Sequence, residues 1–143
     1  MVILALDVGE ARIGVAVSDP SATLASPRGL IRRHSNAQAL AAVAREVAAV
    51  GAKLIVVGLP LSLDGALREQ ARRVQRFGER LRSQVAVPVV YQDERLSTVT
   101  AAEALRAAGV RPDRIKERLD AAAAAVILRD YLDQHPADPA PTA

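Results

Sequence analysis

The chain has 143 residues, of which 50% are hydrophobic, so it is long enough for one domain with a core of its own. It contains no cysteine, which excludes disulfides, thiolate metal sites and cysteine nucleophiles, and its two histidines exclude a three-histidine zinc site. No apolar run reaches the roughly 20 residues of a membrane span and no secretory signal is visible, so we expect a cytoplasmic protein without a membrane partner.

Arginine supplies most of the positive charge. The formal net charge is +3, and all but two of the 19 basic residues are arginine, the exceptions being Lys53 and Lys116. Because a guanidinium group binds phosphate through two parallel hydrogen bonds, this composition is suited to a phosphate-bearing partner. The alternative is a genomic bias that also explains the many alanines. Aromatic residues are only 2% of the chain, which argues against recognition by base stacking.

The N-terminal part of the chain predicts three consecutive strands. Residues 2–6 are a continuous apolar run, which is typical of a central strand buried on both faces. Gly9 permits a turn into a second strand at 13–18, so these two strands should pair as a hairpin. A third strand within 22–32 is expected at the edge of the sheet, because Pro27 cannot donate a ladder hydrogen bond.

Helices and strands alternate through the middle of the chain. Ser35 begins a capping pattern, and an alanine-rich helix follows it to about Val50, where Gly51 suits the C-cap. Residues 53–58 predict a buried strand. A helix with apolar residues at helical spacing is expected from about 66 to 83.

The C-terminal part predicts one more strand and two helices. The strand is expected at 85–91, with Pro88 near its start or at an edge. A short helix is expected at 97–109 and a long one at 112–134. Residues 135–143 hold three prolines and several small residues, which is typical of a flexible tail.

This order of elements predicts one α/β domain over residues 1–134. Three antiparallel strands are followed by two strands that helical crossovers make parallel, which gives a mixed five-stranded sheet flanked by helices. No internal repeat is apparent in the sequence.

Carboxylates are the groups best suited to chemistry, because thiols are absent and histidines are scarce. Asp7 ends the first strand, and Asp93 and Glu94 follow the last one, so they are expected where ligands bind in α/β sheets. The alternatives are a turn aspartate and an ordinary polar loop. His34 and His135 are expected at the surface.

Asp120 precedes an apolar stripe on the last helix, which continues at helical spacing through Ile127 and Tyr131. Burying an ionised carboxylate is costly unless it is paired or bound to a metal, so this position suggests a metal ligand. The alternative is an ion pair with Lys116, in the less favourable orientation for a helix. If Asp120 converges with Asp7 and the carboxylate after the last strand, the three suit Mg²⁺ or Mn²⁺.

Four arginines recur at every fourth residue of the helix expected at 66–83. They are Arg68, Arg72, Arg76 and Arg80. One interpretation is a face that follows nucleic-acid phosphates, with Arg72 and Arg76 in contact with substrate. The other is a solvated face with Glu69 and Glu79 as local partners.

Four segments, in this order, resemble the YqgF/RuvX family of ribonuclease H-like nucleases. They are LDVGEARIGVAVSD at 6–19, VGLPLSLDG at 57–65, DERLST at 93–98 and KERLDAAAAAVIL at 116–128. Each segment alone is weakly specific. Together, at compatible spacing, they are strongly specific and cover nearly the whole chain.

The resemblance implies a ribonuclease H-like fold and metal-dependent cleavage of phosphodiester bonds, with two Mg²⁺ or Mn²⁺ ions. Members are described as Holliday junction resolvases and as nucleases that mature the precursor of 16S ribosomal RNA, so branched DNA or precursor rRNA is the expected partner. The family's acidic triad falls on Asp7, Glu94 and Asp120. Its basic positions fall on Arg12, Arg95 and Lys116. Because a four-way junction requires two cuts, a homodimer is expected for that substrate.

Three residues depart from the family's pattern. Glu10 stands where a small or hydroxyl residue is expected, Ser62 where asparagine is usual, and Ala66 where serine is usual. Glu10 adds an extra acidic side chain beside the expected acidic site. The other two affect details of the loop at 58–65 but not the acidic triad.

Two other functions fit parts of the sequence. A non-catalytic nucleic-acid-binding module could keep the same fold, and binding without cleavage in Mg²⁺ and Mn²⁺ would identify it. A sugar-kinase or actin-like ATPase also has a strand that ends in Asp-x-Gly, but 143 residues are too few for its two lobes. The sequence leaves the choice between junction DNA and precursor RNA open.

Overall fold

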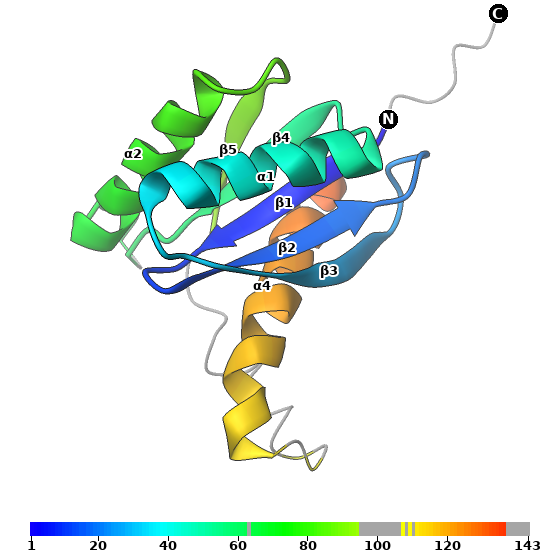
Figure 1. Ribbon diagram of the computed structural model, residues 1–143. Coiled ribbons are helices and arrows are strands. Elements are labelled where there is room, and N and C mark those ends of the chain that lie inside the picture. The colour runs from blue at the N-terminus through cyan, green and yellow to red at the C-terminus, as the bar shows by residue number, and fades with distance from the viewer. Residues whose placement is uncertain (63, 95–106, 108, 110, 137–143) are drawn as a thin grey trace, which may run out of the picture.

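The computed structural model describes residues 1–62, 64–94, 107, 109 and 111–136, with the backbone alone for 112–120 (Figure 1). Five strands form one sheet in the order β3-β2-β1-β4-β5. The strands are β1 Ile3–Val8, β2 Arg12–Ser18, β3 Ala25–Arg32, β4 Leu54–Leu59 and β5 Val89–Asp93. The helices are α1 Asn36–Val50, α2 Glu69–Arg82 and α4 Pro112–Gln134.

The sheet is mixed, as the sequence predicted. β1 pairs antiparallel with β2, and β2 with β3, whereas β1 and β4, and then β4 and β5, pair in parallel. β3 is an edge strand, so Pro27 costs no ladder hydrogen bond on its open side. The register between β2 and β3 shifts between Val15 and Ala16, opposite the segment that contains this proline.

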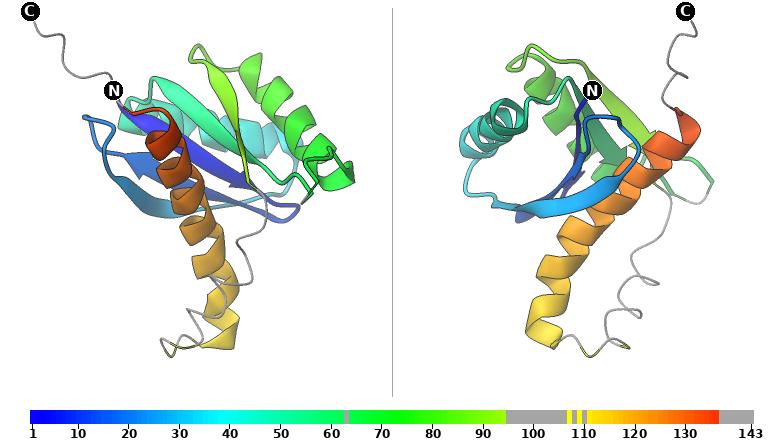
Figure 2. Two further views of the ribbon diagram at one scale, coloured as in Figure 1. Left: turned by 180° about the vertical axis from the view of Figure 1, so that it is seen from behind. Right: turned by 90° about the vertical axis from the view of Figure 1, so that its right-hand side faces the viewer.

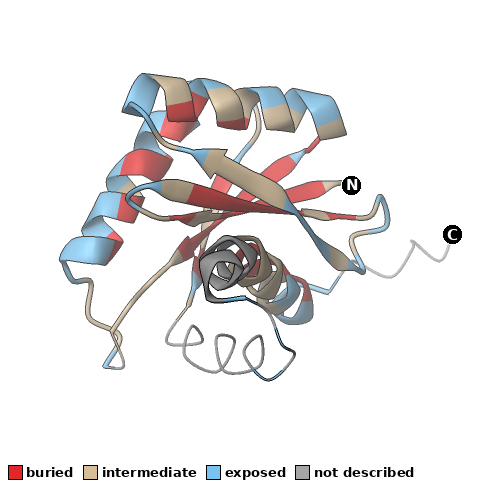
Figure 3. Ribbon diagram, turned by 60° about the horizontal axis from the view of Figure 1, so that its bottom comes forward, coloured by how far each residue is buried: buried red, intermediate tan, exposed pale blue. Residues whose placement is uncertain are grey.

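Helices cover both faces of the sheet. α1 and α2 lie on one face and α4 crosses the other, which the two views of Figure 2 show from behind and from the side. Because side chains alternate along a strand, β1 contributes to two cores: Leu4 and Leu6 pack on the α1 and α2 side, and Ile3 and Ala5 on the α4 side. Buried residues accordingly concentrate on the strands and on the helix turns that face them (Figure 3).

The predicted caps of α1 are confirmed. The Ser35 hydroxyl accepts a hydrogen bond of 3.1 Å from the Gln38 N–H, which satisfies one free donor of the first turn. Gly51 ends the helix in the left-handed region, at φ 67°, where a residue without Cβ is favoured. α4 also begins where expected, with Pro112 in its first turn.

Two elements begin three or more residues later than predicted. α2 begins at Glu69 rather than near 66, because the preceding loop folds on Asp64, whose carboxylate accepts a 3.0 Å hydrogen bond from the Ala66 N–H. β5 begins at Val89 rather than 85, because Pro88 has no N–H to continue the ladder.

Other expectations fall largely on residues that the structure does not describe. The short helix expected at 97–109 lies mostly outside the described residues, as does most of the expected tail. Of the helices that are described, none combines the length and hydropathy needed to cross a membrane.

Candidate active site

Asp7 lies near the carboxyl end of β1, on the face of the sheet that α4 covers, since it alternates with Leu6 on the opposite side. Its partner in β2 is Gly14. The parallel register that pairs Leu6 with Val57 brings Gly58 of β4 alongside Asp7 on its other flank. Glycines therefore stand on both sides, and no side chain from either position covers the Asp7 carboxylate.

Gly58 also lets α4 and the loop after β5 approach the sheet closely. A Cβ atom built on Gly58 would lie 2.8 Å from Cγ1 of Ile127 and 3.6 Å from Cγ of Glu94. The first distance is a clash and the second is ordinary contact. Because Gly58 has no side chain, Ile127 can pack directly on β4. For the same reason Glu94 lies next to the strand that flanks Asp7.

Glu94 follows β5 directly and is held by its backbone, because its N–H donates a 3.0 Å hydrogen bond to the Leu59 carbonyl. Its carboxyl group is hydrogen-bonded to Asp130 of α4. Oε1 of Glu94 is buried and has no hydrogen-bond partner among the described residues. A buried carboxylate oxygen without a partner is costly, so it marks a place where a ligand would stabilise the site.

The surroundings of Glu94 disfavour its charged form. Burial, first, and then the hydrogen bond to Asp130 and the charges of Asp130, Asp93 and Asp7 raise the pKa of Glu94 to about 8. Asp7 and Glu94 are therefore close enough for their charges to interact. A divalent cation would offset this repulsion and supply the missing partner of Oε1, so this donor set fits such an ion.

Asp130 was missed by the sequence analysis. It is half-buried on α4, three residues after Ile127, so helical spacing places it beside the apolar stripe that contacts the sheet. That spacing was the available signal. Asp120 lies at the start of the stripe and was predicted from it, whereas Asp130 lies at its margin and was not.

The structure brings Asp7 and Glu94 together but leaves the third predicted ligand undecided. Asp120 and Lys116 lie within α4, in the part where only the backbone is described, and Arg95 lies outside the described residues. Among the side chains that the structure describes, no three acidic or histidine residues are grouped as metal ligands would be. The triad of Asp7, Glu94 and Asp120 therefore stays a prediction.

The other predicted residues lie at or near the surface. Arg12 is the first residue of β2 and is half-buried. Arg72 and Arg76 are exposed on α2, which packs on the face of the sheet opposite Glu94. His34 and His135 are both exposed, as expected.

Comparison with known proteins identifies relatives along the whole domain. The family described as "RuvX: Holliday junction resolvase" matches residues 1–134. A "Putative pre-16S rRNA nuclease" of Chloroflexus aurantiacus is 46% identical over 138 residues, which cover 96% of this chain and 90% of that protein. A protein of the same name from Chloroflexus aggregans is 49% identical over 131 residues, or 92% of each chain.

Solved structures confirm the predicted ribonuclease H-like fold. Thermus thermophilus RuvC, in complex with a Holliday junction substrate, matches with a TM-score of 0.56 at 15% identity, over 96% of this chain and 97% of that one. The fowlpox virus Holliday junction resolvase matches with a TM-score of 0.55 at 13% identity, over 94% of this chain and 99% of that one. At these identities the likeness concerns the fold alone.

Proposed function

Because the chain belongs to the RuvX family of Holliday junction resolvases, we propose that it is a metal-dependent nuclease that hydrolyses phosphodiester bonds of structured nucleic acid. The observation that carries this proposal is the buried Oε1 of Glu94 near Asp7, at the carboxyl edge of the sheet, which no described residue hydrogen-bonds. Family membership supports a hydrolase acting on nucleic acid. The carboxylate environment supports the metal dependence.

Asp7, Glu94 and Asp120 would hold one or two Mg²⁺ or Mn²⁺ ions. Asp120 is included because its helix packs on the face that bears the other two residues. When bound, such ions polarise the scissile phosphate and lower the pKa of the attacking water.

The chain's own residues would arrange this site before a metal binds. The Leu59 carbonyl holds the backbone of Glu94, and Asp130 holds its carboxyl group. The glycines that flank Asp7 leave its carboxylate accessible from the neighbouring strands. The protein would thus hold a pair of carboxylates in position for the cation, which lowers the cost of assembling the site.

Precursor 16S rRNA is the substrate we favour, because the curated relatives at 46% and 49% identity carry that name. Four-way junction DNA is the second candidate, supported by the family's description, and a homodimer would serve its two cuts. Arg12, Arg95 and Lys116 would contact phosphates near the acidic site. Arg72 and Arg76 would contact phosphates farther along the substrate.

The decisive experiment compares cleavage of a precursor 16S rRNA fragment and of a four-way DNA junction, each in Mg²⁺ and in Mn²⁺. The wild type is tested beside Asp7→Asn, Glu94→Gln and Asp120→Asn, with Asp133→Asn as control because Asp133 is an exposed acid of α4. We expect the control to cleave normally and the three variants to fail. Normal cleavage by Asp120→Asn in saturating metal would contradict its assignment, and binding without cleavage by the wild type would indicate a non-catalytic module.

A further inference from the structure

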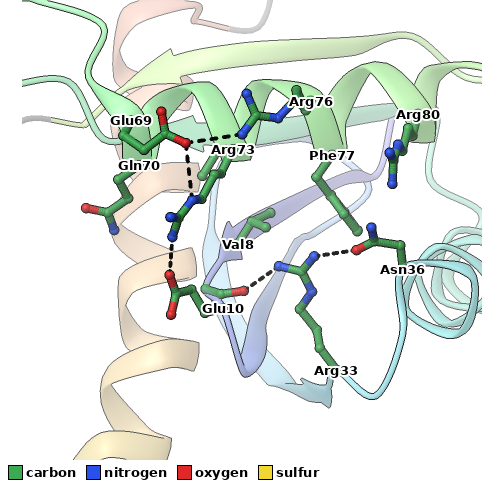
Figure 4. Close-up of a pocket in the computed structure, with 12 residues that line it drawn as sticks. Val8, Glu10, Arg33, Asn36, Glu69, Gln70, Arg73, Arg76, Phe77 and Arg80 are labelled. Carbon is green, nitrogen blue, oxygen red and sulfur yellow. Dashed lines mark hydrogen bonds and ion pairs between the residues drawn. The ribbon is translucent and has the colours of Figure 1, made fainter.

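A pocket of about 560 Å³ lies on the face of the sheet opposite the Asp7 carboxylate (Figure 4). α2, the turn between β1 and β2, and the beginning of α1 enclose it. Its lining includes the apolar side chains of Val8, Val74 and Phe77. Four arginines also line it, and we call it the arginine pocket: Arg33, Arg73, Arg76 and Arg80.

Two of these arginines are balanced by acids within the pocket. Arg73 forms ion pairs with Glu10 and, at 3.5 Å, with Glu69. Arg76 forms an ion pair with the same Glu69 at 3.4 Å. These ion pairs are among the dashed lines of Figure 4, and they leave this end of the pocket close to neutral.

The other two arginines form no ion pair with the acids that the structure describes. Arg33 donates to two neutral oxygens, the Gly9 carbonyl at 2.6 Å and Oδ1 of Asn36 at 2.8 Å, and its guanidinium lies 5.0 Å above the centre of the Phe77 ring. Arg80 is exposed and pairs with no carboxylate among the described residues. This end thus presents one fixed and one exposed guanidinium group, and neither forms an ion pair with a carboxylate of the described residues.

Burial of Arg33 increases the need for an anion. Partial burial lowers the pKa of Arg33, and the nearby charge of Glu10 opposes that effect only in part. A cation whose hydrogen bonds go to neutral acceptors loses hydration without gaining an ion pair, and the charge of Glu10 makes up for this only in part. Its remaining donors would bind an anion with little reorganisation, since its position is already set.

From these contacts we infer that the Arg33 and Arg80 end of the arginine pocket binds a phosphate group, supplied by a nucleic-acid strand or by a free nucleotide. Guanidinium groups match phosphate in shape and charge, and the pocket volume is in the range of small-ligand sites, roughly 300–1,000 Å³. Phe77 is buried and already covered by Arg33, so phosphate rather than a stacked base is the group recognised.

The position of the pocket favours a strand as the source, an argument that rests on the proposed function. Val8 lines the pocket, whereas its neighbour Asp7 faces α4, so the end of β1 separates the two sites. A strand that crosses the carboxyl edge of the sheet would place one phosphate at the acidic site and another at Arg33 and Arg80.

The test measures binding of a labelled 12-nucleotide RNA by fluorescence anisotropy in EDTA, so that no cleavage occurs, over a range of salt concentrations. Arg80→Gln is the main variant, because Arg80 is exposed and its loss leaves the fold intact. We expect Kd to rise about tenfold and the slope of log K against log salt to fall by about 0.7. Arg45→Gln, which removes an exposed arginine of α1 outside the pocket, should change neither quantity.

Two further variants keep the result interpretable. Arg33→Gln should weaken binding as Arg80→Gln does, and its melting temperature shows whether the fold survives. Glu10→Gln should tighten binding, because it removes a carboxylate from the pocket and frees Arg73. Wild-type Kd and salt slope for both Arg80→Gln and Glu10→Gln would overturn the inference.

Separate probes identify the source of the phosphate. A nucleoside 5′-monophosphate and RNAs with and without a 5′-phosphate are titrated against wild type and Arg80→Gln. If only the monophosphate binds in an arginine-dependent way, the pocket belongs to a free nucleotide. Equal binding of both RNAs assigns it to internal phosphodiesters.

If wild-type protein binds RNA through Arg80 but cleaves nothing, the proposed function fails and the pocket stands. If cleavage is normal and both Arg80→Gln and Glu10→Gln bind like wild type, the pocket inference fails alone.

Discussion

The two faces of the sheet carry opposite charge where β1 ends. On the α4 side, Glu94 and Asp7 lie among further carboxylates, and one buried carboxylate oxygen has no hydrogen-bond partner in the part of the chain that the structure describes. On the α1 and α2 side, Arg33 and Arg80 lie in a pocket where neither is ion-paired with an acid of the described residues. Alternation of side chains along one strand is enough to separate two such sites, so a single strand end can serve both a cation and an anion.

The comparison predicts different kinetic effects on the two faces, and the largest belongs to the acidic one. Asp7→Asn should lower the cleavage rate at saturating substrate by about a hundredfold or more, because it removes a charge that holds the metal. Arg80→Gln should raise KM and leave kcat near wild type, because it removes binding that substrate and transition state share. Single-turnover and steady-state rates separate these effects. An equal loss of kcat in both variants would contradict the prediction that the acidic face acts on kcat and the arginine pocket on KM.

Replacing a glycine by alanine should lower the stability of the fold more on the acidic face than at the edge of the sheet. Gly58→Ala should destabilise the fold by about 1–3 kcal/mol, because the new Cβ would clash with Ile127 of α4. Gly29→Ala is the matched control, since a Cβ there meets nothing within 4 Å. Urea unfolding of both variants measures the difference. Equal midpoints would show that α4 does not pack on β4 as described.

Stability of the metal-free protein should depend on pH through the acidic face. The folded-state pKa of Glu94, about 8, lies above its ordinary value of 4.5, so between these values the folded protein binds more protons than the unfolded chain. Stability should therefore fall as pH rises from about 5 to 8. Glu94→Gln cannot titrate and should flatten this dependence, and Asp133→Asn should not. Urea midpoints at several pH values in EDTA provide the measurement.

The smallest expected effect concerns the arginine pocket. Glu10→Gln breaks an ion pair with Arg73 in which both side chains are more than half exposed, so it should change the free energy of unfolding by less than about 1 kcal/mol. Thermal unfolding at low and high salt tests this. A larger loss would mean that the pair supports the fold and does not merely line the pocket.

Local sequence signals predicted most of the fold. Apolar runs located β1, β2 and β4, and the cap residues Ser35 and Gly51 located both ends of α1. The two boundary errors arose where other interactions compete with periodicity. Asp64 draws the chain before α2 into a turn, and β5 starts only after Pro88.

Among the site residues, the sequence by itself determined those whose position follows from an element's end. Asp7 ends a buried strand and Glu94 follows another, so parallel strand order brings both to one edge. Tertiary structure alone decided that Asp130 reaches Glu94 and that Arg33 joins Arg80 in one pocket. The reason is physical: periodicity reports which face a residue occupies on its own element, whereas these contacts depend on how α4, α1 and α2 are docked against the sheet.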